Sequence, residues 1–312
     1  MRLRPIAFFL ALLLLAPAWS KQPPEFDPES LPEIAAQKFD GRDLQIVKTL
    51  AKNAVYTRYL ISYRSGQLKI SGIMNVPAGP GPFPVVITNH GYISPRIYTV
   101  GRGLKREQDY LARRGFVVIH PDYRNHGLSD KDPESENGLR LGYVEDVINA
   151  VLAVKQSDYQ FLDKEKIGMM GHSLGGGICL NIMTTKPDLI KAFVLYAPVS
   201  ADYIDNFNRW GRSNRETAES LLAKYGSPEP TAAFWHNMSA INYLDRVAVP
   251  VQLHHGTRDE SCYIEWSDRL AAALKAKGKN VAYYRYPGER HEFGPQWTQF
   301  MARTAKYFHD LL

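Results

Sequence analysis

The strongest constraint on the fold is an alternation of short apolar runs with helix patterns between residues 84 and 312. Apolar runs of four to six residues are typical of strands that are buried on both faces of a sheet. The runs are Pro84–Thr88, Phe116–His120, Ile167–Met170, Ala192–Tyr196, Val249–Leu253 and Val281–Tyr286. Helix patterns separate them, with apolar residues at a spacing of 3.6, as in Val144, Val147, Ile148, Val151 and Leu152. This alternation predicts an α/β fold with a mostly parallel central sheet and helices on both faces.

Three segments depart from the alternation. Residues 56–63 and 68–76 are β-rich and flank the turn-like Ser65-Gly66, which predicts an antiparallel pair. Residues 21–40 are rich in proline and acidic side chains, and we expect residues 21–50 to form an arm on the surface. Residues 201–247 contain no strand pattern but seven aromatic residues. We expect them to form a cap inserted into a single domain that spans residues 21–312.

The first twenty residues have the pattern of a secretory signal peptide. Arg2 and Arg4 precede eleven apolar residues in a row, Ile6–Ala16, and Ala18-Trp19-Ser20 provides small residues at the cleavage positions. Eleven residues rise only about 16 Å as a helix, which is too short to span a hydrocarbon core. The alternative is an uncleaved membrane anchor. We expect an exported protein, periplasmic or secreted, with no membrane contact after residues 1–20 are removed.

Charge and cysteine content exclude several classes of protein. The formal net charge is +6, or +4 without Arg2 and Arg4, and no run of Lys and Arg is long enough to follow a phosphate backbone. Nucleic acid is therefore not an expected partner. Cys179 and Cys262 are the only cysteines, so one disulfide is possible but no disulfide framework or zinc-ligand spacing exists. Cys179 lies in an apolar helix pattern, where a free cysteine acts as a small core residue.

A candidate nucleophile follows the strand at Ile167–Met170. The sequence there reads Gly-His-Ser-Leu-Gly over residues 171–175 and continues into a helix. This strand–turn–helix context gives the Gly-x-Ser-x-Gly motif its meaning, because the tight turn holds Ser173 at a helix N-terminus. A phosphate-binding loop would need Gly-Lys-Ser/Thr, which is absent here. We expect Ser173 to be a nucleophile.

A serine nucleophile needs a histidine base that a carboxylate orients, in the chain order Ser, Asp or Glu, His. His291 lies in the loop after Val281–Tyr286, where parallel sheets place catalytic groups. Asp259 lies in the loop after Val249–Leu253, one strand earlier. The alternatives for the acid are Glu260, Asp202 and Asp205. His254 and His255 close a strand and are expected to shape the site instead of acting as the base.

An oxyanion hole needs two donors. The expected donors are the backbone N–H of Leu174, next to the nucleophile, and that of Tyr92, in the loop after Pro84–Thr88. Tyr92 could instead only line the pocket. Together with His172 and Trp210, it is also a candidate for substrate contact. No metal or cofactor is predicted.

The span from Pro84 to Leu312 resembles the α/β-hydrolase superfamily, and within it the catalytic domains of prolyl oligopeptidases and related bacterial esterases. The resemblance rests on five features of the sequence, which are His90-Gly91-Tyr92, the segment DYRNHGLS at 122–129, Gly171–Gly175, Asp259 and His291. It implies an α/β-hydrolase fold and a serine hydrolase with a Ser173–His291–Asp259 triad.

Two departures from prolyl oligopeptidases favour esters over peptides. Those enzymes carry a large β-propeller, for which we expect no room in 312 residues, and Asn89 takes the place of a tyrosine ahead of the oxyanion loop. The leading hypothesis is therefore an esterase that acts on small carboxylic esters through an acyl-enzyme. The alternatives are a peptidase for short or acylated peptides, and a binding protein without turnover. The sequence does not predict the oligomeric state.

Overall fold

Nine strands form one sheet in this computed structural model, which describes residues 30–133 and 139–312. The strand order is β1-β2-β3-β5-β4-β6-β7-β8-β9. The strands are β1 (Arg42–Lys52), β2 (Tyr56–Ser65), β3 (Leu68–Pro77), β4 (Phe83–Asn89), β5 (Val117–Pro121), β6 (Leu162–His172), β7 (Ala192–Tyr196), β8 (Val251–Gly256) and β9 (Val281–Tyr286). From β5 to β9 all neighbours pair in parallel, whereas β1, β2 and β3 extend the sheet with antiparallel pairs. The expected mostly parallel sheet is confirmed.

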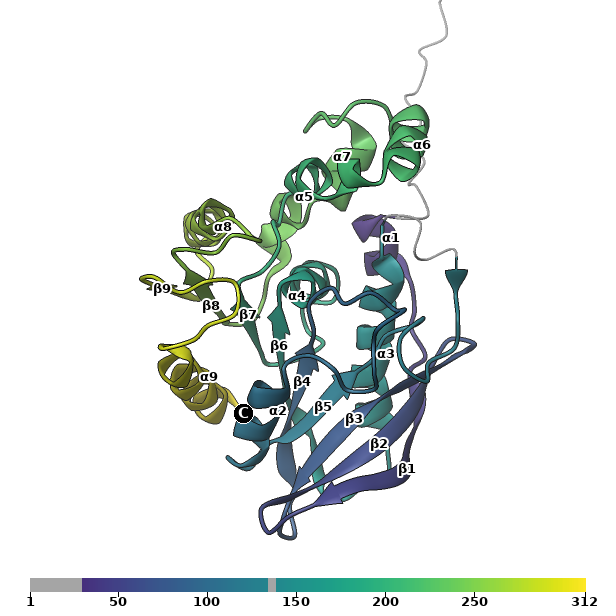
Figure 1. Ribbon diagram of the computed structural model, residues 1–312, viewed down its shortest axis with the longest axis vertical. Helices are drawn as coiled ribbons and strands as arrows, with labels where there is room; N and C mark the ends of the chain where they lie inside the picture. Colours follow the sequence, from purple (N-terminus) through teal and green to yellow (C-terminus); the bar gives the residue numbers. More distant parts are fainter. Residues whose placement is uncertain (1–29, 134–138) are drawn as a thin grey trace, which may run out of the picture.

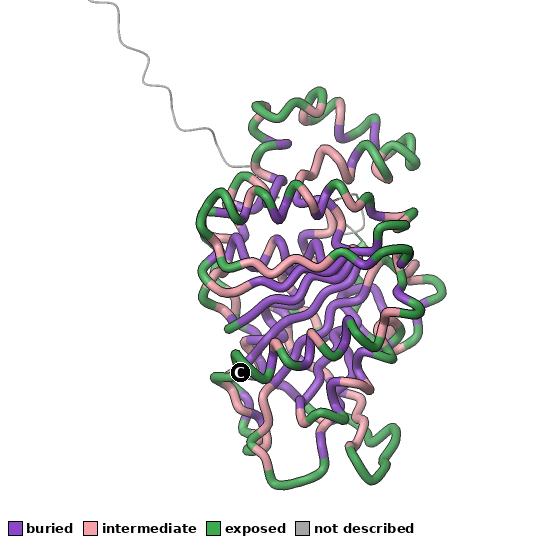
Figure 2. The backbone as a smooth tube through the Cα atoms, turned by 90° about the vertical axis from the view of Figure 1, so that its left-hand side faces the viewer, coloured by how far each residue is buried: buried purple, intermediate pink, exposed green. Residues whose placement is uncertain are grey.

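Helices cover both faces of this sheet (Figure 1). The helices packed against it are α2 (Lys105–Ala112), α3 (Leu141–Gln156), α4 (Leu174–Thr185), α8 (Ile264–Ala276) and α9 (Trp297–Leu311). Successive strand residues point to opposite faces. Accordingly, Val85 and Ile87 of β4 pack in one core cluster with α3, α4 and α8. Val86 packs in the other cluster, with α2 and α9. The apolar runs of the central strands are buried, as their sequence predicts (Figure 2).

The N-terminal region differs from the predicted arm. Leu31–Ala36 form the short helix α1, which Ser30 caps through its side chain. Arg42–Lys52 form β1, an edge strand paired with β2, so the assignment of residues 21–50 to a surface arm is wrong for this part. Three register shifts interrupt the β1–β2 pairing, and Leu44 is the only fully buried residue of β1. The alternating apolar pattern that identifies a strand in the sequence is therefore lost here.

The segment between β7 and β8 contains helices and no strand. They are α5 (Tyr203–Arg209), η2 (Gly211–Ser213), α6 (Arg215–Tyr225), α7 (Ala233–Met238) and η3 (Ala240–Arg246). We call residues 201–247 the cap. Figure 1 shows α5, α6 and α7 above the carboxyl ends of the strands.

The proposed signal peptide, residues 1–20, lies outside the described residues. Within the part of the chain that the structure describes, no helix is long and apolar enough to cross a membrane.

Candidate active site

Ser173 lies at the junction of β6 and α4 in a strained backbone conformation. Its φ of 55° and ψ of −119° are unfavourable for a residue with a Cβ atom. The turn is held by hydrogen bonds from the Ser173 N–H to the Tyr196 carbonyl (3.1 Å) and from the Gly177 N–H to the Ser173 carbonyl (3.1 Å). The strain is therefore fixed by the adjoining strand and helix, and it presents the hydroxyl at the end of the sheet.

The two glycines of the motif allow close packing around this turn. A Cβ atom on Gly171 would overlap the carbonyl oxygen of Gly175, and one on Gly175 would overlap the carbonyl oxygen of Asn89. The helix and the end of β4 thus approach each other more closely than any side chain permits. This is the steric role that the sequence predicts for the motif.

Asp259 and His291 lie on the loops after β8 and β9, respectively, and are hydrogen-bonded. The distance from His291 Nδ1 to Asp259 Oδ2 is 2.8 Å. A carboxylate accepts the proton of Nδ1, so the Nε2 atom of a neutral His291 carries the lone pair. Asp259 Oδ1 accepts the backbone N–H groups of Ser261 (2.8 Å) and Cys262 (2.9 Å). The Asp259 carboxylate is therefore fixed at both oxygens.

A second histidine, His255, contacts the same carboxylate. Its Nε2 atom lies 3.1 Å from Asp259 Oδ2 and 3.0 Å from the Cys262 carbonyl oxygen. Both neighbours are acceptors, so Nε2 carries the proton, and Nδ1 accepts the Ser267 hydroxyl at 2.6 Å. Burial on its own raises the pKa of Asp259, but the hydrogen bonds from His255 and His291 outweigh it and hold this pKa well below its usual range.

His172 packs against His291 and is hydrogen-bonded to its backbone. Its Nε2 atom is 3.0 Å from the His291 carbonyl oxygen, and the two rings lie 4.5 Å apart. Burial, with a contribution from His291, lowers the pKa of His172 to about 3. His172 is therefore a neutral donor to the His291 backbone.

The competing acids are engaged elsewhere. Glu260 pairs with Arg290 at the surface (2.7 Å). Asp202 caps α5 by accepting the Ile204 N–H (2.9 Å), and Asp205 pairs with Arg269. Among the described residues, Asp259 is the one acid of these four that is hydrogen-bonded to His291.

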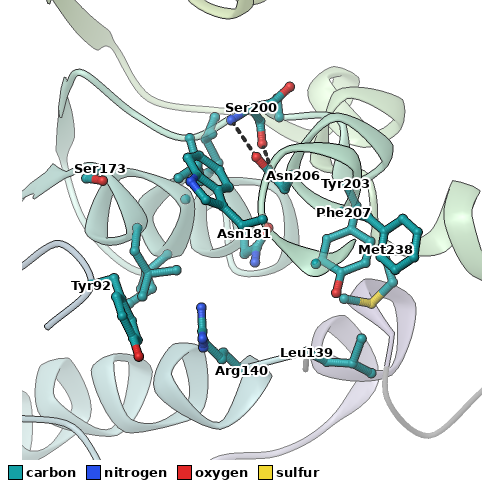
Figure 3. Close-up of a pocket in the computed structure, with 18 of the residues that line it drawn as sticks. Tyr92, Leu139, Arg140, Ser173, Asn181, Ser200, Tyr203, Asn206, Phe207 and Met238 are labelled. Carbon is teal, nitrogen blue, oxygen red and sulfur yellow. Dashed lines mark hydrogen bonds between the residues drawn. The ribbon is translucent and has the colours of Figure 1, made fainter. Parts of the chain in front are cut away.

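A cavity of about 620 Å³ brings the predicted site residues together. Ser173, Leu174, Tyr92, Trp210 and His291 all line it. Figure 3 shows Ser173 and Tyr92 along one side of the cavity and cap residues, among them Tyr203 and Phe207, on the other. Of the predicted site residues, Asp259 and His172 are not part of this lining, and both are hydrogen-bonded to His291.

The expected oxyanion donors lie on elements beside Ser173. Leu174 is the first residue of α4, where helix N–H groups have no partner within the helix. A Cβ atom on Gly91, next to Tyr92, would lie 3.0 Å from the Ser173 Cβ, so this loop passes directly by the nucleophile. The side chain of Asn89 is fully buried and donates to Cys179 Sγ (3.4 Å). This side chain therefore faces the core, and Asn89 supplies no side-chain donor in place of the tyrosine hydroxyl.

The cap aromatics divide between two roles. Tyr225 stacks on Phe234 with ring centroids 3.6 Å apart, and Trp235 is fully buried. These residues form the core of the cap itself. Tyr203, Phe207 and Trp210 instead line the cavity.

The cysteines are both free and buried. Cys179 lies in the core of α4, as a small apolar residue would. Cys262 Sγ is 4.0 Å from Ser173 Oγ, a contact that no sequence motif indicates. Among the described residues, no group of three or more His, Cys, Asp or Glu side chains is arranged to hold a metal ion.

A sequence profile of the prolyl oligopeptidase family (Peptidase_S9) matches residues 103–311. This match covers the nucleophile motif, Asp259 and His291 in one alignment. The chain belongs to the prolyl oligopeptidase family. The resemblance inferred from the motifs is thereby confirmed.

Two curated relatives differ in how much of their length this chain covers. The chain is 27% identical over 239 residues to the uncharacterized peptidase YuxL of Bacillus subtilis. The alignment covers 71% of this chain and 33% of YuxL. The chain is 25% identical over 249 residues to the uncharacterized peptidase YtmA of the same organism, spanning 78% of this chain and 90% of that protein. The chain thus corresponds to about a third of YuxL but to nearly all of YtmA.

Solved structures confirm the α/β-hydrolase fold of this prolyl oligopeptidase family member. Acetyl xylan esterase 1 from Thermoanaerobacterium sp. superimposes with a TM-score of 0.66 at 18% identity, over 89% of this chain and 90% of that one. At this level of identity the similarity concerns the fold.

Proposed function

We propose that the protein is an exported serine hydrolase that cleaves small carboxylic esters through an acyl-enzyme. Ser173 attacks the ester carbonyl, and His291 Nε2 takes the hydroxyl proton and returns it to the leaving alcohol. Asp259 holds the imidazole in the required tautomer, and the N–H groups of Leu174 and Tyr92 stabilise the oxyanion. The observation that carries this proposal is the 2.8 Å bond from His291 to Asp259, with His291 and Ser173 lining one cavity.

The choice of esters over peptides is supported by the cavity lining. Among the described residues that line the cavity none is Asp or Glu. A peptide with a free amino terminus would therefore bury an ammonium group without a carboxylate partner. The aromatic residues of the cap offer an apolar surface for an acyl or aryl group instead.

A comparison of matched substrates tests this proposal. We expect 4-nitrophenyl butyrate to be cleaved at least about 10³-fold faster, in kcat/KM, than the butyryl, alanyl and acetylalanyl 4-nitroanilides, a difference of about 4 kcal/mol. The reason is that an amide nitrogen must be protonated before it leaves, whereas an aryloxide leaves readily. Comparable rates on either aminoacyl anilide would contradict the ester proposal and favour the peptidase alternative. If a fluorophosphonate probe fails to label Ser173, the protein has no serine hydrolase activity at this site, and the binding-protein alternative is favoured.

His255 is expected to act as a positioning residue for Asp259. Replacement by phenylalanine removes the donor at Nε2, and we expect kcat to fall about 10- to 100-fold, the effect of one hydrogen bond to a charged group. KM should change little, because the lost interaction orients the base and does not contact substrate. His255→Gln, which keeps a donor of similar reach, should recover part of kcat. A general loss of packing would instead lower the activity of both variants equally.

A further inference from the structure

The cavity lining includes one arginine, Arg140. Of the described residues that line it, Arg140 is the one Lys or Arg, and none is acidic. The residue precedes α3 with a φ of 52°, a conformation that residues other than glycine adopt rarely. Figure 3 shows its side chain extending toward the cavity between Tyr92 and Asn181.

The Arg140 side chain lacks the partners that other inward-facing arginines have. Its Nε atom is buried, and it has no hydrogen-bond partner among the residues that the structure describes. Arg124, by comparison, makes ion pairs with Asp146, Glu145 and Asp132, each at 2.9 Å. A buried donor without an acceptor is unfavourable. A ligand that supplies the acceptor therefore gains more binding free energy at Arg140 than at an arginine that is already paired.

Tyr92 connects this cation to the nucleophile. The Arg140 guanidinium carbon lies 4.6 Å from the centroid of the Tyr92 ring, and the Tyr92 loop passes directly beside Ser173. A guanidinium that stacks on an aromatic face keeps the N–H groups at its edge free for a planar acceptor. An anion held there would be separated from the reacting carbonyl by roughly the length of a tyrosine side chain.

On the basis of the proposed hydrolase function, we propose that Arg140 selects substrates that carry a carboxylate several bonds away from the scissile ester. One unpaired guanidinium matches the single charge and planar shape of a carboxylate, which it binds through two parallel hydrogen bonds. The carboxylate can belong to the acyl group or to the alcohol.

Two matched substrate pairs separate these sources. On the acyl side, monomethyl adipate is compared with methyl hexanoate, which has a methyl group in place of the carboxylate. On the alcohol side, 4-acetoxybenzoate is compared with its methyl ester. For each pair the measured quantity is the ratio of kcat/KM for the anionic ester to that for the neutral ester.

We expect Arg140→Gln to lower this ratio about tenfold or more in one of the two pairs, since a charge-assisted hydrogen bond is lost. Arg140→Lys should keep part of the ratio, because it retains the charge without the planar fork. Arg212→Gln is the control, since Arg212 is an exposed cap residue outside the lining whose loss changes the net charge equally. Ratios that Arg140→Gln leaves unchanged in both pairs would overturn the proposal.

Binding of adipate to the intact protein, measured by calorimetry, tests the anion site independently of the proposed hydrolysis. We expect adipate to bind at least about tenfold more weakly to Arg140→Gln than to the Arg212→Gln control. If adipate binding shows this loss but neither ester is cleaved and Ser173 is not labelled, the hydrolase proposal fails and the anion site stands. If esters are cleaved but Arg140→Gln changes neither adipate binding nor the kcat/KM ratios, the anion-site proposal fails and the hydrolase proposal stands.

Discussion

Replacement of Ser173 by alanine is expected to lower kcat by about 10⁶, the scale of loss known for serine nucleophiles that act in a triad. Without the hydroxyl, no acyl-enzyme can form, and only binding and the oxyanion donors remain. The measurement is hydrolysis of 4-nitrophenyl butyrate at saturating substrate, together with circular dichroism to verify that the variant is folded. The substitution leaves the backbone strain at this position unchanged, because alanine also has a Cβ atom at a φ of 55°.

Ser227→Ala serves as the control for this experiment, because Ser227 is exposed on the cap and does not line the cavity. It should retain activity within about twofold, as is usual for surface substitutions. A loss of less than tenfold in Ser173→Ala would remove Ser173 from the mechanism, whatever the result for Ser227.

Replacement of Asp259 by asparagine is expected to cost about 10⁴ in kcat. The reason lies in the donors around the carboxylate. Oδ1 accepts two backbone N–H groups, from Ser261 and Cys262, so the carbonyl oxygen of an asparagine stays at this position. Its NH₂ group then faces His255 and His291, where Oδ2 was the acceptor. His291 must accept at Nδ1, and Nε2 becomes protonated and is no longer a base.

Glu260→Gln is the matched control for this variant. Glu260 is adjacent in the sequence, but its side chain pairs with Arg290 at the surface. We expect a change of less than about threefold in kcat, since exposed ion pairs contribute little. A large loss in Glu260→Gln together with a small loss in Asp259→Asn would transfer the acid role to Glu260.

The parallel half of the fold follows from local sequence patterns. Strands that are buried on both faces are continuous apolar runs, and β7, which is buried at every residue, coincides with the predicted residues. β9 also has its predicted bounds, although it lies at the edge of the sheet. The edge strand β1 could not be recognised in this way. Its existence depends on pairing with β2, and the bulges at Arg42–Gln45, Ile46–Lys48 and Thr49–Ala51 shift its side chains out of the alternating pattern. Pairing partners are non-local information that a short window of sequence does not contain.

The candidate site divides in the same manner. Ser173, Asp259 and His291 each follow a predicted strand, and the carboxyl ends of parallel strands converge on one edge of the sheet. Their side-by-side placement could therefore be predicted. Arg140 and Cys262 could not, because neither belongs to a motif. Arg140 lines the cavity from a left-handed residue directly before α3, and Cys262 lies near Ser173 in the loop after β8.

The cap leaves the fold and returns to it at nearly the same point. The Ile241 N–H donates to the Ala201 carbonyl (3.0 Å), and the Tyr203 N–H donates to the Ser239 hydroxyl (2.9 Å). The first and last turns of this segment are thus neighbours, while Asp259 and His291 lie on later loops. An insertion with adjacent ends can be exchanged as one piece, as domains inserted into surface loops are. Evolution or protein engineering can accordingly replace the cap, which lines one side of the cavity, without moving the proposed triad.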